Sequence, residues 1–73
     1  MKINKPVTLS CREKQCLELS VRGKSARLAA LELGLSQRTV EEYLNKVKSK
    51  LGVRSKGEMI ELWLRMKLGA TQD

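Results

Sequence analysis

Residues 25–40 read Ser-Ala-Arg-Leu-Ala-Ala-Leu-Glu-Leu-Gly-Leu-Ser-Gln-Arg-Thr-Val, and this stretch decides the fold. Its glycine, Gly34, can adopt the left-handed conformation that ends one helix and turns the chain sharply. A serine stands before each of the two helices as an N-cap. Ala30 is small enough for the helices to approach closely, and Val40 is expected to insert beside the first helix. Two helices joined by a tight glycine-containing turn are typical of a helix-turn-helix.

Two further helices are predicted around this pair. Residues 10–13 are Ser-Cys-Arg-Glu, a capping box that begins a helix which Gly23 ends. Residues 55–58 are Ser-Lys-Gly-Glu, a second capping box before a helix which Gly69 ends. The predicted helices cover 11–22, 26–33, 37–51 and 56–68. With no alternating β pattern, the sequence predicts an all-α fold, a four-helix bundle that contains a helix-turn-helix.

The chain of 73 residues has the size of one small domain. This domain is predicted over 9–69, between a flexible N-terminal tail at 1–8 and a C-terminal tail at 70–73. Cys11 and Cys16 lie roughly 7.5 Å apart along one helix, too far for a disulfide, and without any His they do not suit a zinc site. No metal and no other cofactor is therefore expected. A second subunit is the expected extra support for so small a core.

The chain is strongly basic, with 15 Lys and Arg against 8 Asp and Glu, a net charge of +7. This balance indicates an anionic partner such as nucleic acid or an acidic membrane surface. The absence of His, of an evident carboxylate pair and of a phosphate-binding glycine loop argues against an enzyme. The two aromatic residues, Tyr43 and Trp63, are too few for a protein that stacks successive bases. No secretory or membrane-spanning segment is evident, so a soluble intracellular protein is expected.

The predicted helix over 37–51 separates apolar from polar side chains. Its apolar residues fall within a stripe roughly 100° wide: Val40, Tyr43, Leu44, Val47 and Leu51. Five cations and no acids lie between Leu44 and Gly57: Lys46, Lys48, Lys50, Arg54 and Lys56. A second basic group precedes and begins the helix over 26–33: Arg22, Lys24 and Arg27. This pattern suits a helix in the major groove with phosphate-neutralising cations around it, and a solvated basic face is the alternative.

The helix over 56–68 carries more apolar residues than one buried face needs. They span roughly 240°, whereas a surface helix needs little more than 100°. We therefore expect them to divide between the core and a contact with a second copy. Trp63 suits either place. The dimerisation candidates are Met59, Ile60, Leu62, Trp63, Leu64, Met66 and Leu68.

Several spaced blocks together resemble a known family. They are Leu9-Ser-Cys-Arg-Glu, Gly23, Gly34-Leu-Ser-Gln-Arg-Thr-Val-Glu, Lys50-Leu-Gly-Val and Ser55-Lys-Gly-Glu. In this order, over about residues 9–68, they resemble the LuxR/GerE family of bacterial transcription regulators. The resemblance implies a cytoplasmic DNA-binding domain whose third helix enters the major groove and whose fourth helix forms a dimer. Leu28 and Ala29 depart from the family pattern, so the second helix is expected to pack differently or to expose Leu28 and Leu31 to a partner.

The resemblance also implies roles for individual residues. Those expected to face base edges are Glu41, Glu42 and Asn45. Asn45 can pair with adenine, and a carboxylate can accept from N4 of cytosine. Alternatively, Glu41 or Glu42 turns toward Arg38 or Lys46. The phosphate-binding candidates are Arg27, Ser36, Arg38, Thr39, Lys46, Lys48 and Lys50.

The predicted function is sequence-specific binding of double-stranded DNA in transcription regulation. The expected partners are DNA, a second copy held weakly without DNA, and RNA polymerase. The alternative is a basic interaction module that binds polymerase, another protein or a membrane surface without sequence-specific DNA binding. An RNA-binding helical domain is a weaker alternative. The sequence leaves open a stand-alone regulator or the C-terminal domain of a larger one, the operator, the regulating signal, and activation or repression.

Overall fold

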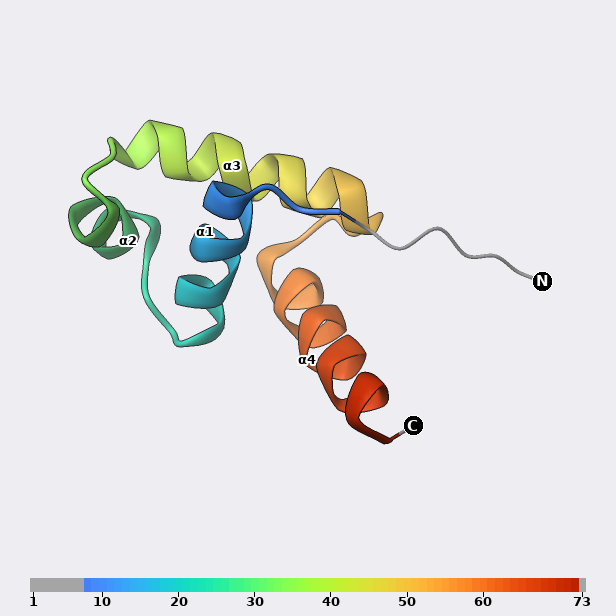
Figure 1. The fold of residues 1–73 in the computed structure, drawn as a ribbon. Helices are drawn as coiled ribbons and strands as arrows, with labels where there is room; N and C mark the ends of the chain where they lie inside the picture. The colour runs from blue at the N-terminus through green and yellow to red at the C-terminus, as the bar shows by residue number, and fades with distance from the viewer. Residues whose placement is uncertain (1–7, 73) are drawn as a thin grey trace.

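The computed structural model describes residues 8–72, with side chains described for residues 8–66. Four helices follow one another, α1 (Cys11–Val21), α2 (Ala26–Leu33), α3 (Gln37–Leu51) and α4 (Lys56–Gln72) (Figure 1). No strand occurs within residues 8–72, and the predicted all-α fold is confirmed. Residues 1–7 of the predicted N-terminal tail lie outside the described residues.

Serine side chains begin the helices as predicted. The Oγ of Ser10 accepts the backbone N–H of Glu13 at 3.2 Å, and the Glu13 carboxylate accepts the Ser10 N–H at 2.9 Å, so this capping box is complete. Ser25 and Ser36 each accept the backbone N–H three residues later, at the start of α2 and of α3. Each bond satisfies a backbone donor that has no partner within its helix.

The second predicted capping box forms only in half. Ser55 accepts the N–H of Glu58 at 3.1 Å, as expected. The Glu58 carboxylate, however, accepts the N–H of Arg54 at 3.0 Å, one residue before the cap. The chain bends at Arg54 and Ser55, which brings the earlier N–H within reach of the carboxylate.

Left-handed glycines follow three of the helices, as predicted. Gly23, with φ of +88°, comes directly after Arg22, the C-cap of α1. Gly34 and Gly52 have φ of +70° and +73° and cap α2 and α3 in the left-handed conformation. The prediction that Gly69 ends the last helix is wrong, because α4 continues to Gln72 and includes residues expected to form a tail. A glycine inside a helix costs only about 1 kcal/mol relative to alanine, which does not by itself stop the helix.

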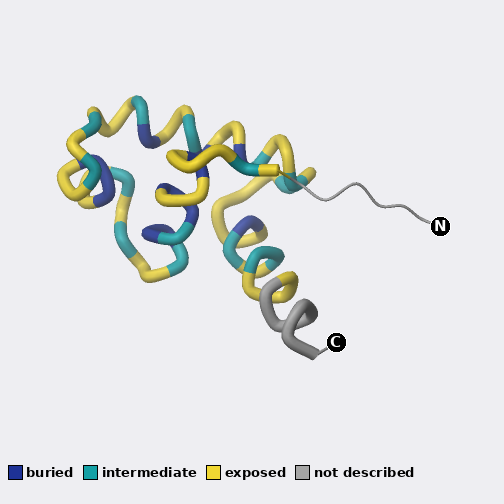
Figure 2. Tube along the Cα trace, viewed as in Figure 1, coloured by how far each residue is buried: buried dark blue, intermediate teal, exposed yellow. Residues whose placement is uncertain are grey.

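The core lies where α1, α2 and the first turn of α4 meet α3. Its fully buried side chains are Cys16, Leu17, Val40, Val47 and Met59. Ala29 and Ala30 are buried as well, which confirms the close approach of α2 and α3. Burial raises the pKa of the Cys16 thiol, as suits a neutral core residue, while Cys11 is exposed. Among the side chains of α4 that the structure describes, Figure 2 shows full burial only near the beginning of the helix.

Two helices leave large apolar side chains exposed. In α2, Leu28 is 48% exposed and Leu31 is 73% exposed, as the departure from the family pattern led us to expect. In α4, Leu64 and Met66 are exposed. Among the described residues, no helix has both the length and the apolar character needed to cross a membrane.

Candidate nucleic-acid interface

Within residues 8–72, no other element covers the outer face of α3. Figure 1 shows α3 along one edge of the molecule, with α1, α2 and α4 on the same side of it. The predicted apolar stripe of α3 is buried at Val40, Leu44 and Val47, with the remaining two members half-buried. The opposite face is therefore polar and exposed. Its exposed residues are Arg38, Glu41, Glu42, Asn45, Lys46 and Ser49.

Two hydroxyl groups lie together at the start of α3. The Oγ of Ser36 accepts the backbone N–H of Thr39 at 3.1 Å and lies 2.8 Å from Oγ1 of Thr39. Ser36 is exposed and Thr39 half-buried. The unpaired backbone donors of the first helical turn lie beside these hydroxyls, an arrangement that suits a phosphate oxygen.

The two acidic residues of the exposed face have different partners. Oε2 of Glu41 accepts from Nε2 of Gln37 at 3.1 Å. Oε2 of Glu42 lies 3.5 Å from Nε of Arg38. Of the alternatives open from the sequence, Glu42 thus turns toward Arg38. Gln37 was missed, although its spacing of four residues from Glu41 is the signal that could have found it.

The predicted phosphate-binding cations differ in their exposure and in whether an acidic side chain pairs with them. Arg27 and Lys46 are exposed, and Lys48 is half-buried. Arg38 is exposed but paired with Glu42. Outside this set, Lys24 forms an ion pair of 2.8 Å with Glu32.

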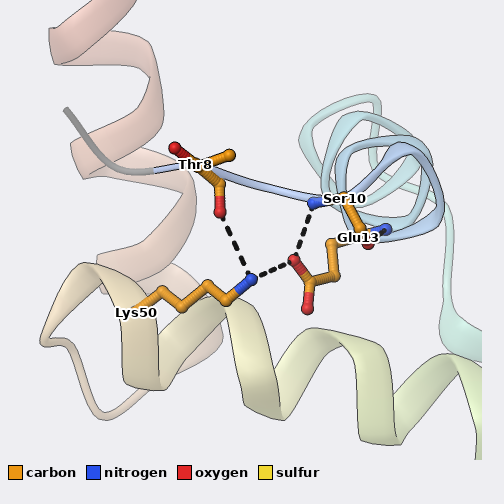
Figure 3. A network of polar contacts seen from close by, with 4 residues as sticks. All are labelled: Thr8, Ser10, Glu13 and Lys50. Atoms are coloured by element: carbon orange, nitrogen blue, oxygen red, sulfur yellow. Dashed lines mark hydrogen bonds and ion pairs between the residues drawn. The ribbon is translucent and has the colours of Figure 1, made fainter.

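Lys50 pairs with two acceptors beside the start of α1, although 41% of its side chain stays exposed. Its Nζ lies 2.7 Å from Oε1 of Glu13 and 3.2 Å from the carbonyl oxygen of Thr8 (Figure 3). The side chain of Glu13 is only 5% exposed. The hydrogen bond from the Lys50 ammonium is the main cause that lowers the pKa of Glu13 below its ordinary value, and the Ser10 N–H is the second. Desolvation of the carboxylate acts in the opposite direction and raises this pKa, but it is the weaker effect. Sequence reasoning gave Glu13 a capping role only, because a partner 37 residues away leaves no local pattern.

A hollow of about 220 Å³ lies beside α3, between the beginnings of α2 and α4. Buried Leu44 and Met59 line it together with Ala26. Its polar lining residues are Glu41, Asn45, Lys48 and Lys56. The hollow thus brings two of the three predicted base-contacting residues together with one predicted phosphate ligand. No three His, Cys, Asp or Glu side chains gather as a metal site would need within the part of the chain that the structure describes.

The dimerisation candidates of α4 divide by burial. Met59 is fully buried, so it belongs to the core and leaves the candidate set. The half-buried members are Ile60, Leu62 and Trp63, and the exposed ones are Leu64 and Met66. The side chain of Leu68 lies outside the described residues.

Known proteins share this sequence pattern. Residues 7–63 match the family model of bacterial regulatory proteins, luxR family. The chain is 40% identical over 58 residues to the transcriptional regulatory protein TdiR of Thauera aromatica. The aligned segment covers 80% of this chain and 26% of that protein. It is 36% identical over 58 residues to the probable HTH-type transcriptional regulator GfsR of Streptomyces halstedii, with 80% and 24% covered. It is 35% identical over 63 residues to the spore germination protein GerE of Bacillus subtilis, with 86% and 84% covered. The chain thus spans about a quarter of the length of the first two relatives and most of the third.

Proposed function

Because the chain belongs to the luxR family of bacterial regulatory proteins, we propose that α3 enters the major groove of double-stranded DNA and contacts base edges there. As a member of this family, the chain is a DNA-binding helix-turn-helix domain that acts in transcription regulation, and it is not an enzyme. The proposed place of action is the bacterial cytoplasm, where the DNA is found.

The uncovered face of α3 carries this proposal. A helix whose inner stripe is buried and whose outer face is exposed can enter a groove without unfolding any part of the domain. Asn45 on this face can form two hydrogen bonds to adenine. The proposed phosphate ligands come from α2 and from α3 with its N-cap: Arg27, Ser36, Arg38, Thr39, Lys46 and Lys48. Lys50 is left out of this set because Glu13 and Thr8 hold its ammonium group.

We further propose that two copies bind one site through α4. Exposed Leu64 and Met66 offer apolar surface beyond the first turns of α4, which the core covers. Half-buried Ile60 packs against the core and leaves part of its side chain exposed beside them. One helix pair buries little area, so the free dimer is expected to be weak and to form mainly on DNA. Two-fold symmetry then requires an inverted repeat, and the expected distance between its half-sites is about one helical turn. RNA polymerase is the proposed further partner, and exposed Leu28 and Leu31 offer it an apolar contact.

Selection of bound duplexes from a random DNA pool tests the DNA proposal. We expect an inverted repeat with half-site centres about 10 base pairs apart. Four proposed cationic phosphate ligands predict a slope of log K against log salt of about −3.6 for one copy and about −7 for two. Binding without any sequence preference would overturn the proposal in favour of a basic interaction module. Binding of the chain to vesicles of anionic lipid would then indicate a membrane-binding module, and no binding to them a protein-binding one.

Sedimentation of the chain alone and with the selected duplex tests the dimer. The chain is expected to be mainly monomeric alone and to bind the full site as two copies. Binding of one copy to the full inverted repeat, even at saturation, would contradict the dimer.

A further inference from the structure

The two adjacent carboxylates of α3 differ in how their charge is compensated. Nε of Arg38 lies beside Glu42 and partly offsets its charge, while the other donors of this 88% exposed guanidinium remain available to a phosphate. Gln37 donates a hydrogen bond to Glu41 but is neutral, so it orients the Glu41 carboxylate and leaves the charge in place. Each partner lies one turn before its carboxylate, where side chains four residues apart meet. Glu41 is therefore the stronger acceptor for a hydrogen bond from outside the protein.

Glu41 also has acceptor capacity to spare. A carboxylate has about four lone-pair sites on its two oxygens. Gln37 uses one of them, on Oε2, and Oε1 of Glu41 has no hydrogen-bond partner among the described residues. Because the side chain is exposed, an external donor can reach Oε1.

The two acidic residues also differ in their position relative to the hollow beside α3. Glu41 and Asn45 both line it, and Glu42 does not. Residues four apart on a helix share one face, so Glu41 and Asn45 approach the same part of a bound groove. Glu42 lies about 100° away around the helix axis, on the side of Arg38.

We propose that Glu41, oriented by Gln37, selects cytosine in the half-site and that Glu42 selects no base. This inference rests on the proposed function, because it requires α3 to lie in the major groove. Cytosine presents its N4 amino group there as a donor, which a carboxylate accepts. The acceptor edges of guanine and thymine repel the carboxylate, and adenine places its N7 acceptor directly beside its N6 amino donor.

The position of the cytosine follows from the helix geometry. Glu41 and Asn45 are about 6 Å apart along the axis of α3. This is less than two base-pair steps of about 3.4 Å. The adenine expected for Asn45 therefore lies within two base pairs of the cytosine.

Selection from a random duplex pool at fixed salt, with sequencing of the bound fraction, tests the inference. For the 73-residue chain we expect cytosine enriched about ten-fold over other bases at one position of each half-site, from a single base contact. Glu41→Ala is expected to abolish the enrichment at that position alone. Gln37→Ala is expected to lower it about three-fold, as for loss of one exposed hydrogen bond, with an unchanged salt slope.

Glu42→Ala is the matched control, because it removes the same side chain one position away. It is expected to keep the cytosine enrichment. Since all three side chains are exposed, the variants should match the parent chain in helix content and thermal unfolding. Glu41→Gln keeps the side-chain size as a second variant, and its amide is expected to shift the preference toward adenine.

The outcomes separate this inference from the proposed function. A parent chain that enriches no sequence overturns the proposed function. An enriched inverted repeat whose cytosine survives Glu41→Ala, or is lost in Glu42→Ala, overturns the inference alone. A Gln37→Ala profile identical to that of the parent chain overturns the positioning role of Gln37.

Discussion

Replacing Met59 with alanine tests which part of α4 belongs to the core. Met59 is 0% exposed, and it is the one fully buried residue among the described side chains of α4. Truncating a buried methionine to alanine lowers the free energy of unfolding by about 2–5 kcal/mol. Because Met59 also borders the hollow beside α3, neighbouring groups and water can fill part of the space. We therefore expect the lower part of this range, about 2–3 kcal/mol.

The expected loss is large for a domain of this size. In domains of 60–100 residues, 1 kcal/mol corresponds to about 4–8 °C in Tm. Met59→Ala should accordingly lower the Tm by about 8–24 °C. Urea denaturation at low protein concentration, followed by circular dichroism, measures the change in the monomer. The fluorescence of Trp63, which packs partly against the core, reports on α4 separately.

Met66→Ala is the matched control, since it is the same substitution in the same helix at a side chain 40% exposed. It is expected to change the free energy of unfolding by no more than about 0.5 kcal/mol, as for a surface position, while weakening self-association on DNA. Equal destabilisation of the monomer by the two substitutions, or an unchanged urea midpoint in Met59→Ala, would refute the division of α4 into a core half and an exposed half.

Three other changes test single features of the fold and the interface. Because the pKa of Glu13 is lowered from its ordinary value of 4.5, its stabilising contribution is present above that pH and is lost as the pH falls through the folded-state pKa. The urea midpoint of the parent chain should therefore fall more steeply below about pH 4.5 than that of Glu13→Gln, and parallel curves would contradict this. Gly34→Ala should cost about 1–2 kcal/mol through its φ of +70° alone, since a Cβ there meets nothing within 4 Å. Gly57→Ala, at the second residue of α4, should instead stabilise by up to about 0.5–1 kcal/mol, and urea midpoints that shift in the same direction in both variants would contradict this. Lys46→Ala should reduce the salt slope by about 0.9, whereas Asn45→Ala should leave the slope unchanged and cost about 1–3 kcal/mol at one base pair. Titrations of the selected duplex at several salt concentrations measure both, and an altered slope in Asn45→Ala would argue against its contact with a base.

Local spacing was enough to predict the helix-turn-helix and most helix ends. A serine cap acts on a backbone N–H three residues away, and a left-handed glycine such as Gly34 or Gly52 acts on the turn it ends. The buried stripe of α3 likewise follows from the periodicity of one helix. These interactions lie within one or two turns, so the order of residue types contains them. The prediction failed at Gly69 because a glycine ends a helix only where its backbone becomes left-handed, and α4 continues through this residue.

The candidate interface was predictable in its residues but not in its pairings. The sequence placed Glu41, Glu42 and Asn45 on one polar face, and all three are exposed. It left two alternatives for the acids, because both can reach several neighbours at helical spacing. The three-dimensional arrangement joined Glu42 to Arg38 and Glu41 to Gln37. It also placed Glu41, rather than Glu42, beside the hollow.

By itself, the sequence determined an all-α chain, four helices, most of their caps and an exposed polar face on α3. Only the tertiary structure decided that Lys50 forms an ion pair with Glu13, 37 residues away in the chain. It also decided that Met59 belongs to the core while Leu64 and Met66 are exposed. The physical reason is the range of the interactions. Caps and helix faces depend on neighbours within a few residues, whereas the burial of one side of α4 and the Glu13–Lys50 ion pair depend on how separate helices pack against each other.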